Sequence, residues 1–188
     1  MSGIASFRFA LAALAILGLT APVATPVANA SSAGAAAQQV TLGPSGLPLP
    51  RFVSLKASRV NLRIGPGRNY SVEWLYLKSG LPMEIIQEFD NWRRVRDSEG
   101  AEGWINQSLL SGRRTAIAAP WQRGKQAEIR LMSAPRDDAR VLASIEPGAI
   151  GTIRTCNGQW CRMVFDGHTG WVAQGQIWGA YPGEAVDD

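Results

Sequence analysis

The sequence predicts an all-β fold in which two small antiparallel barrels follow one another along the chain. One observation is an internal repeat, in which Trp92-Arg93-Arg94-Val95 and Gly103-Trp104-Ile105 recur as Trp160-Cys161-Arg162-Met163 and Gly170-Trp171-Val172. The Trp runs are offset by 68 positions and the Gly-Trp steps by 67, the length of a small domain. The other observation is that short alternating apolar runs, separated by turn sequences, fill residues 51–183, which is typical of small all-β barrels.

The first copy is predicted to span residues 51–112. Val60, Leu62 and Ile64 alternate with polar residues at the period of a half-buried strand. Gly65-Pro66-Gly67 then breaks the run with a turn. Further strands are predicted over residues 72–77, 81–85, 92–96 and 103–105.

The second copy is predicted to span residues 126–183 in the same order. Ile129 and Leu131 open it, and Asn157-Gly158 is a strong signal for a tight hairpin. The remaining strands are predicted over residues 141–145, 150–156, 160–165 and 170–172. Residues 113–125 are interpreted as a connector between the copies, and residues 184–188 as a tail.

Residues 1–30 carry the pattern of a cleavable signal peptide. An apolar run over residues 9–19 follows Arg8, and Ala28-Asn29-Ala30 is a small-x-small cleavage site. We therefore expect cleavage after Ala30, a periplasmic or secreted protein, and no stable membrane span after processing; the alternative is a retained N-terminal anchor. Residues 31–50, rich in Ala, Ser, Gly and Pro, are interpreted as a flexible tether.

The charge of the chain is unevenly divided between its two halves. Residues 51–125 hold 13 Lys and Arg against 7 Asp and Glu, whereas residues 126–188 hold 5 against 8. A basic half favours anionic partners such as cell-wall polymers or phospholipid headgroups, and export argues against nucleic acid. The alternative is a charge distribution that serves solubility alone.

The two cysteines, Cys156 and Cys161, flank the predicted hairpin turn. Cross-strand Cβ atoms lie about 4.5–5.5 Å apart, close to the roughly 3.8 Å of a disulfide, so we expect a structural bond in an oxidising compartment. A zinc site with His168 and a Cys-His nucleophile are the alternatives, but a disulfide removes every thiolate. Aligning the copies places Glu88 and Arg93 at the corresponding positions, which predicts an ion pair there.

The aromatic residues supply the candidate binding surface. Trp104 and Trp171 are expected to fill the barrels, while Trp74 and Tyr76 share a face and are expected to be partly exposed. Packing against the second domain is the alternative for these rings. The candidate ligand-binding residues are Trp74, Tyr76, Tyr70, Trp92, Arg63, Arg68, Arg93 and Arg94.

Several stretches resemble the exported bacterial SH3-like (SH3b) family, whose tandem members are common in alphaproteobacteria. They are Val60-Asn61-Leu62-Arg63, Gly65-Pro66-Gly67, Trp92-Arg93-Arg94-Val95-Arg96-Asp97, Leu109-Leu110-Ser111-Gly112-Arg113-Arg114 and Trp178-Gly179-Ala180-Tyr181-Pro182. The resemblance implies two SH3-like barrels, each with a groove Trp, at Trp92 and Trp160. It also implies binding to peptidoglycan or its peptide stems.

No catalytic pattern stands out in the sequence. A Ser-His-Asp set, a carboxylate pair and a glycine-rich phosphate loop are not apparent, so we expect no enzyme, no metal site and no cofactor. Two hypotheses follow: a cell-envelope module that binds peptidoglycan or its peptide stems, and a periplasmic scaffold that binds an envelope protein.

Overall fold

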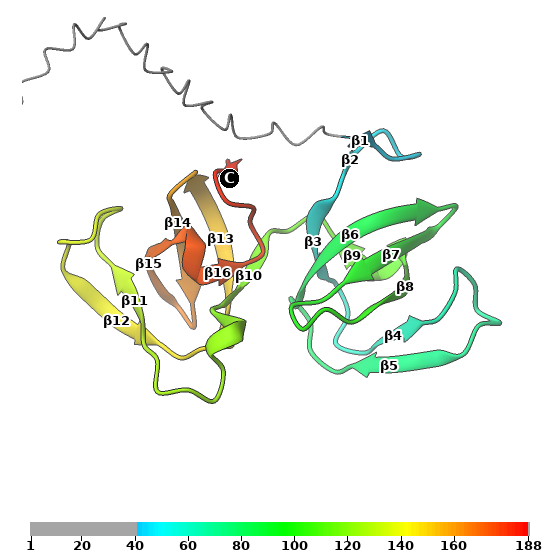
Figure 1. Cartoon of the computed structure of the whole chain (residues 1–188), viewed down its shortest axis with the longest axis horizontal. Coiled ribbons are helices and arrows are strands. Elements are labelled where there is room, and N and C mark those ends of the chain that lie inside the picture. The colour runs from blue at the N-terminus through cyan, green and yellow to red at the C-terminus, as the bar shows by residue number, and fades with distance from the viewer. Residues whose placement is uncertain (1–40, 188) are drawn as a thin grey trace, which may run out of the picture. The chain divides into compact units, whose positions relative to one another are not determined.

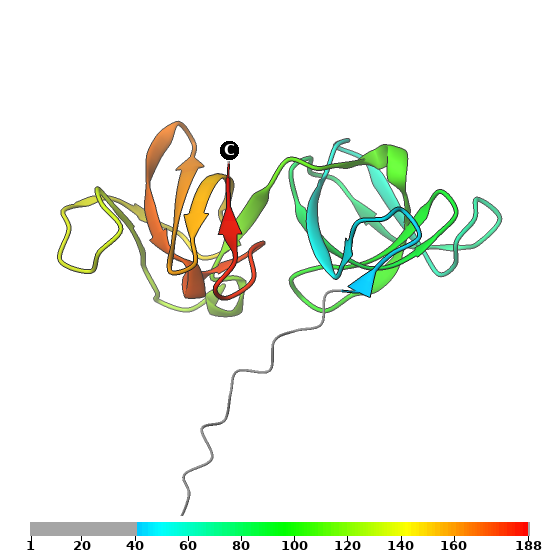
Figure 2. The ribbon, with the colours of Figure 1, turned by 90° about the horizontal axis from the view of Figure 1, so that it is seen from above.

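The computed structural model describes residues 41–187 (Figure 1). The predicted signal peptide, its cleavage site and the first part of the predicted tether lie outside these residues. Within them, three short 3-10 turns accompany the strands, and no helix is long and apolar enough to cross a membrane. The strands gather into two groups, which Figure 2 shows from above.

The first barrel is one antiparallel sheet in the order β5-β4-β8-β7-β6-β3-β9. Its strands are β3 (Arg51–Leu55), β4 (Val60–Arg63), β5 (Val72–Tyr76), β6 (Pro82–Phe89), β7 (Trp92–Arg96), β8 (Glu102–Asn106) and β9 (Leu110–Ser111). The turn η1 (Gln107–Leu109) lies between β8 and β9. The predicted strands of the first copy are therefore all present.

The second barrel repeats this order as β12-β11-β15-β14-β13-β10-β16, with β17 added beside β13. Its strands are β10 (Thr115–Ala118), β11 (Ile129–Met132), β12 (Val141–Ile145), β13 (Ile150–Asn157), β14 (Trp160–Phe165), β15 (His168–Ala173), β16 (Ile177–Trp178) and β17 (Ala185–Val186). The turn η2 (Pro120–Gln122) lies between β10 and β11, and the turn η3 (Gln174–Gln176) lies between β15 and β16. The prediction of two small antiparallel barrels in tandem is confirmed.

Three segments that were predicted to be irregular contain β-strands. Within the predicted tether, β1 (Thr41–Leu42) pairs with β2 (Pro48–Leu49) as a short hairpin. Within the predicted connector, β10 pairs with both β13 and β16, so it is a strand of the second barrel. Within the predicted tail, β17 pairs with β13. β10 and β17 are defined by partners distant in the sequence, which local periodicity does not reveal.

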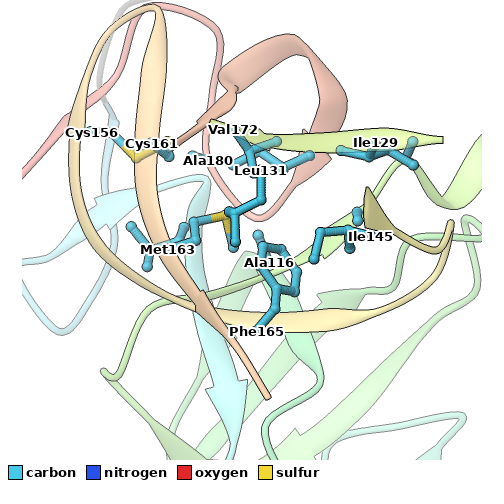
Figure 3. Packing of buried hydrophobic residues seen from close by; sticks show 14 of the residues in the cluster. Ala116, Ile129, Leu131, Ile145, Cys156, Cys161, Met163, Phe165, Val172 and Ala180 are labelled. Carbon is cyan, nitrogen blue, oxygen red and sulfur yellow. A yellow bond between two sulfur atoms is a disulfide. The ribbon is translucent and has the colours of Figure 1, made fainter. Parts of the chain in front are cut away.

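Each barrel encloses its own apolar core. In the first barrel, Val60 and Leu62 point inward as their alternation predicts, whereas Ile64 follows the end of β4 and is exposed. In the second barrel, side chains from all eight strands converge, as Figure 3 shows for Ile129, Leu131, Met163 and Val172. Burying each such aliphatic side chain contributes about 1.5–3 kcal/mol.

The expectation that Trp104 and Trp171 fill the barrels is wrong. Strand alternation turns Gly103 and Ile105 inward, which leaves Trp104 half-buried on the outer face. A Cβ atom at Gly103 would lie 2.6 Å from Leu62 Cγ, and one at Gly170 would lie 2.6 Å from Leu131 Cγ. Glycine precedes the tryptophan in both copies because the inward position has no room for a side chain.

Candidate functional site

A cationic groove lies on the outer face of the first barrel beside Trp92. This Trp92 groove has a volume of about 430 Å³ and draws its lining from β4, the residue before it, the loop after it, β7, β8 and η1. Its lining residues are Arg59, Asn61, Arg63, Arg68, Trp92, Asn106, Ser108 and Leu109.

The alternation of β4 positions the polar side of this groove. Val60 and Leu62 are buried, so Asn61 and Arg63 point outward. Trp92 begins β7 and lies opposite Asn106 of β8 in the strand register. The groove is therefore built from the outer faces of neighbouring strands whose inner faces form the core.

The groove holds three guanidinium groups, and among residues 41–187 no acidic side chain lines it. Arg63 donates a hydrogen bond to the carbonyl oxygen of Tyr70 at 2.6 Å. Arg59 and Arg68 have no hydrogen-bond or ion-pair partner within the described part of the chain. A planar guanidinium with free N–H groups matches a carboxylate or phosphate, so the groove suits an anionic ligand.

The second barrel carries a smaller groove at the same place. This Trp160 groove has a volume of about 110 Å³ and is lined by Arg130, Met132, Asp137, Trp160, Ala173 and Gln176. Met132 faces Trp171 across the sheet just as Arg63 faces Trp104, so Met132 stands where the first barrel has Arg63. Because Asp137 also offsets Arg130, the Trp160 groove lacks the concentrated positive charge of the Trp92 groove.

The candidate ligand-binding residues do not form one site. The structure brings Arg63, Arg68 and Trp92 together in the Trp92 groove. The exposed ring of Tyr70 lies against Gly65, next to this groove. Arg94 pairs with Glu102 at 2.9 Å on the barrel surface.

Trp74 and Tyr76 lie apart from the Trp92 groove and differ in exposure. Trp74 is 59% exposed, whereas Tyr76 is 7% exposed, so the expected exposure holds for Trp74 and is wrong for Tyr76. Tyr76 ends β5, where its ring enters the core and its hydroxyl donates a hydrogen bond to Asp97 at 2.8 Å. Burial and this hydrogen bond raise the pKa of Tyr76.

Arg93 is buried and is not available to a ligand. Its Nε atom lies 3.2 Å from Glu88 Oε1, as the alignment of the copies predicts, and the two residues face each other in the register. Glu88 also accepts from Arg51 at 2.7 Å and from the backbone and hydroxyl of Ser45 at 2.8 Å each. Burial raises the pKa of Glu88, but the hydrogen bonds from Ser45 and Arg51 outweigh it and lower the pKa to about 2.

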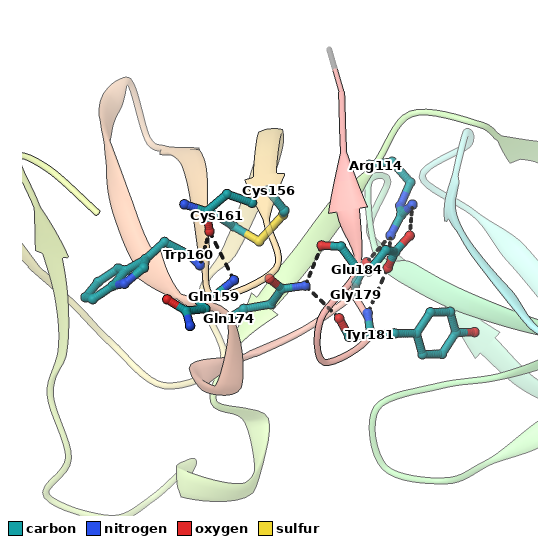
Figure 4. Close-up of a disulfide and its surroundings, with 10 residues drawn as sticks. Arg114, Cys156, Gln159, Trp160, Cys161, Gln174, Gly179, Tyr181 and Glu184 are labelled. Carbon is teal, nitrogen blue, oxygen red and sulfur yellow. Dashed lines mark hydrogen bonds and ion pairs between the residues drawn. A yellow bond between two sulfur atoms is a disulfide. The ribbon is translucent and has the colours of Figure 1, made fainter. Parts of the chain in front are cut away.

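The predicted disulfide is confirmed. Cys156 and Cys161 are directly opposed on β13 and β14, with Cα atoms 4.1 Å apart, and form a disulfide (Figure 4). The hairpin turn is tied by Asn157, whose side chain accepts from the N–H groups of Gln159 and Trp160. Both cysteines are thereby used, so the zinc and nucleophile alternatives have no thiolate.

Sequence reasoning missed Arg59 and Asn61, which share the outer face of the chain around β4 with Arg63. Their spacing of two positions was a signal, because residues i, i+2 and i+4 of an extended segment face the same way. Asn106 and Ser108 were also missed. They reach the groove only because β8 and η1 fold beside β7, which is a non-local feature.

Comparison with known proteins agrees with this architecture. The family model for the bacterial SH3 domain matches residues 56–112 and 125–179. The two repeated barrels, each with its Trp groove, thus define a tandem bacterial SH3 protein. The chain belongs to the bacterial SH3 domain family.

Comparison with curated proteins gives no match. Among solved structures, the chain is similar to NlpC2 from Trichomonas vaginalis at 15% identity and a TM-score of 0.30, covering 69% of this chain and 48% of that one. It is likewise similar to NlpC1 from Trichomonas vaginalis at 14% identity and a TM-score of 0.30, covering 73% and 48%. The chain thus spans about half the length of these structures.

Proposed function

We propose that the protein is a non-catalytic binding module of the cell envelope that contacts peptidoglycan, or its peptide stems, through the Trp92 groove. The single observation that carries this proposal is the set of three outward arginines, Arg59, Arg63 and Arg68, gathered around a tryptophan. Peptide stems carry carboxylates, which arginine binds through two parallel hydrogen bonds. The half-buried indole of Trp92 offers an apolar surface beside them.

Membership of the bacterial SH3 domain family supports the proposal at the level of the module. The difference between the two grooves supports it at the level of the site. A Trp begins β7 and β14 in both barrels, whereas three arginines gather only in the first barrel, and the second barrel has the same fold without them. The first barrel therefore carries the ligand contact.

Sedimentation with purified sacculi tests this function. The mature protein is expected to sediment with sacculi at low salt and to be released as salt rises, because the screening length falls from about 10 Å at 0.1 M to about 3 Å at 1 M. Arg59→Glu together with Arg68→Glu is expected to weaken binding about tenfold, which corresponds to about 1.4 kcal/mol. Both side chains are exposed, so folding should be retained.

A matched control is Arg136→Glu together with Arg140→Glu, which makes the same change of net charge on exposed positions of the second barrel. This control is expected to bind as the wild type does. If the folded mature protein stays in the supernatant at low salt, the peptidoglycan function is rejected.

A protein scaffold is the second candidate, and an aromatic cluster favours it. The ring centroids of Phe52 and Trp178 lie 5.0 Å apart in an edge-to-face arrangement, and Tyr181 lies 4.7 Å from Phe52. The hydroxyl of Tyr181 donates to Glu84 at 2.9 Å. These contacts join β3 and β6 of the first barrel to the segment around β16 of the second, and this mutual contact of the barrels supports the scaffold candidate.

A further inference from the structure

A second hollow, distinct from the Trp92 groove, opens beside the exposed ring of Trp74. This Trp74 hollow has a volume of about 280 Å³. Buried Tyr76, Pro82 and Met83 form its apolar floor together with Ile117 of β10, and Asp97 and Glu99, from the turn after β7, line its rim.

The second barrel fills the corresponding place with apolar side chains. Ile145 faces Ile129 in the register as Tyr76 faces Val60. Phe165 ends β14 and its ring lies in the core (Figure 3). A Cβ atom at Gly151 would lie 2.7 Å from this ring. In the second barrel, the ring of Phe165 thus fills the end of the core that follows β14. At the corresponding position after β7, the first barrel has the carboxylate of Asp97.

The charge around the Trp74 hollow is negative. The carboxylate of Asp97 accepts the hydroxyl of Tyr76 at 2.8 Å and the backbone N–H groups of Glu99 and Ala101 at 2.9 Å each, which fixes its position. Beyond desolvation and the bond to Asp97, the charges of Asp97, Glu99 and Glu73 also raise the pKa of Tyr76. This negative site lies in the half of the chain that is positive overall.

A basic side chain of the chain itself already reaches this rim. Arg123 Nη1 lies 2.8 Å from Glu99 Oε1, and Arg123 also lines the hollow. The two side chains are 52% and 70% exposed, so the pair is weak and easily exchanged. The pair shows that a guanidinium on a long aliphatic stem fits the rim.

We propose that the Trp74 hollow binds a lysine or arginine side chain of a partner polypeptide whose extended segment lies along β5. The aliphatic stem packs on the floor, the cation meets Asp97 and Glu99, and the face of Trp74 covers it through a cation–π contact. β5 is the edge strand of its sheet and pairs only with β4 among the described strands. Its outer N–H and C=O groups can therefore pair with an added strand.

The site goes beyond the proposed wall-binding function because it has the opposite charge and different residues. The test uses the purified protein and an N-acetylated octapeptide in which lysine alternates with valine. The reference peptide has every lysine replaced by glutamine. Titration followed by NMR is expected to shift the indole N–H of Trp74 and the amides of residues 97–101 with the lysine peptide only.

Variants at exposed positions sharpen the test. Trp74→Ala is expected to weaken binding of the lysine peptide about three- to tenfold, the range of a cation–π contact. Glu73→Gln with Glu99→Gln is expected to weaken binding by a similar factor. Arg123→Gln is expected to tighten it, because the variant removes the internal competitor for Glu99. Leu142→Ala, on the corresponding edge strand β12, is the matched control and should change nothing.

Three outcomes would overturn the proposal. One is equal binding of the glutamine peptide, and another is a set of shifts that leaves Trp74 and residues 97–101 unmoved. The third is that Trp74→Ala abolishes sedimentation with sacculi while peptide binding is unchanged, which would assign the hollow to the wall instead. Arg59→Glu with Arg68→Glu should leave peptide binding intact, which separates this site from the Trp92 groove.

Discussion

Glu88 and Cys156 occupy the same place in the two barrels, yet they stabilise it by different chemistry. Glu88 faces Arg93 on the neighbouring strand, and Cys156 faces Cys161. The side chain of Glu88 is 1% exposed and also binds Ser45, the turn residue of the N-terminal hairpin. A single buried carboxylate thus joins this hairpin to the first barrel.

Replacement of this carboxylate should destabilise the first barrel. Glu88→Gln is expected to lower the free energy of unfolding by about 1–3 kcal/mol, because it removes a charged acceptor from buried donors. Chemical denaturation at pH 7 measures the loss. Glu146→Gln, at an exposed position of the second barrel, is the control and should change it by less than about 0.5 kcal/mol.

The pKa of Glu88 also predicts a pH dependence. Folding lowers this pKa from an ordinary value of 4.5 to about 2. As the pH falls, Glu88 therefore takes up a proton in the unfolded chain before it does so in the folded protein. The stabilisation is therefore complete above about pH 4.5 and is lost as the pH falls toward 2. A wild-type protein whose stability between pH 5 and pH 2 parallels that of Glu88→Gln would contradict this assignment.

At the scale of the element, the β13–β14 hairpin combines the disulfide with an added strand. Cys156 pairs with Val186 and Asn157 with Ala185, so β17 lies along the strand that the disulfide ties. Glu184, just before β17, pairs with Arg114 at 2.8 Å, just before β10 (Figure 4). The end of the described chain is thereby held on the second barrel.

Reduction of the disulfide should loosen this hairpin and not its counterpart. The chain-entropy model assigns a short loop a stabilisation of about 2 kcal/mol, and the first barrel has no cysteine to lose. Hydrogen exchange with and without a dithiol reductant is expected to show faster exchange in β14 and β17 and unchanged exchange in β7. Two thiols that react in the native, exported protein would contradict the disulfide.

At the scale of the whole molecule, the two barrels share one topology but differ in charge and in their outer surfaces. The first carries the cationic Trp92 groove and most of the lining of the negative Trp74 hollow. The second fills the corresponding end with Phe165 and carries a smaller, balanced groove. Both copies thus keep the fold, and the first presents most of the candidate binding surfaces.

Processing is the prediction that belongs to the whole chain. The signal-peptide pattern predicts a mature protein that begins at Ser31. The intact mass of the protein from a periplasmic extract measures this directly. A full-length mass in that fraction would favour the retained N-terminal anchor.

Features with a local signal were predictable from the sequence. The alternation of Val60 and Leu62 placed β4, and Asn157-Gly158 placed the hairpin that opposes the two cysteines. The repeat then transferred that register to the first copy, which predicted the pair of Glu88 and Arg93. Even the outward spacing of Arg59, Asn61 and Arg63 was readable, because strand geometry alone decides which residues share a face.

The sequence by itself therefore determined the fold class, the repeat and the disulfide, since strand alternation and tight turns are properties of neighbouring residues. Only the tertiary structure decided that β10 and β17 are strands, that Arg93 is buried and that Tyr76 enters the core. It also decided that Trp74 stands beside a hollow. These features depend on residues that are not neighbours along the chain, such as β13 for β10 and β17 or Asp97 for Tyr76, and burial is set by such non-local packing.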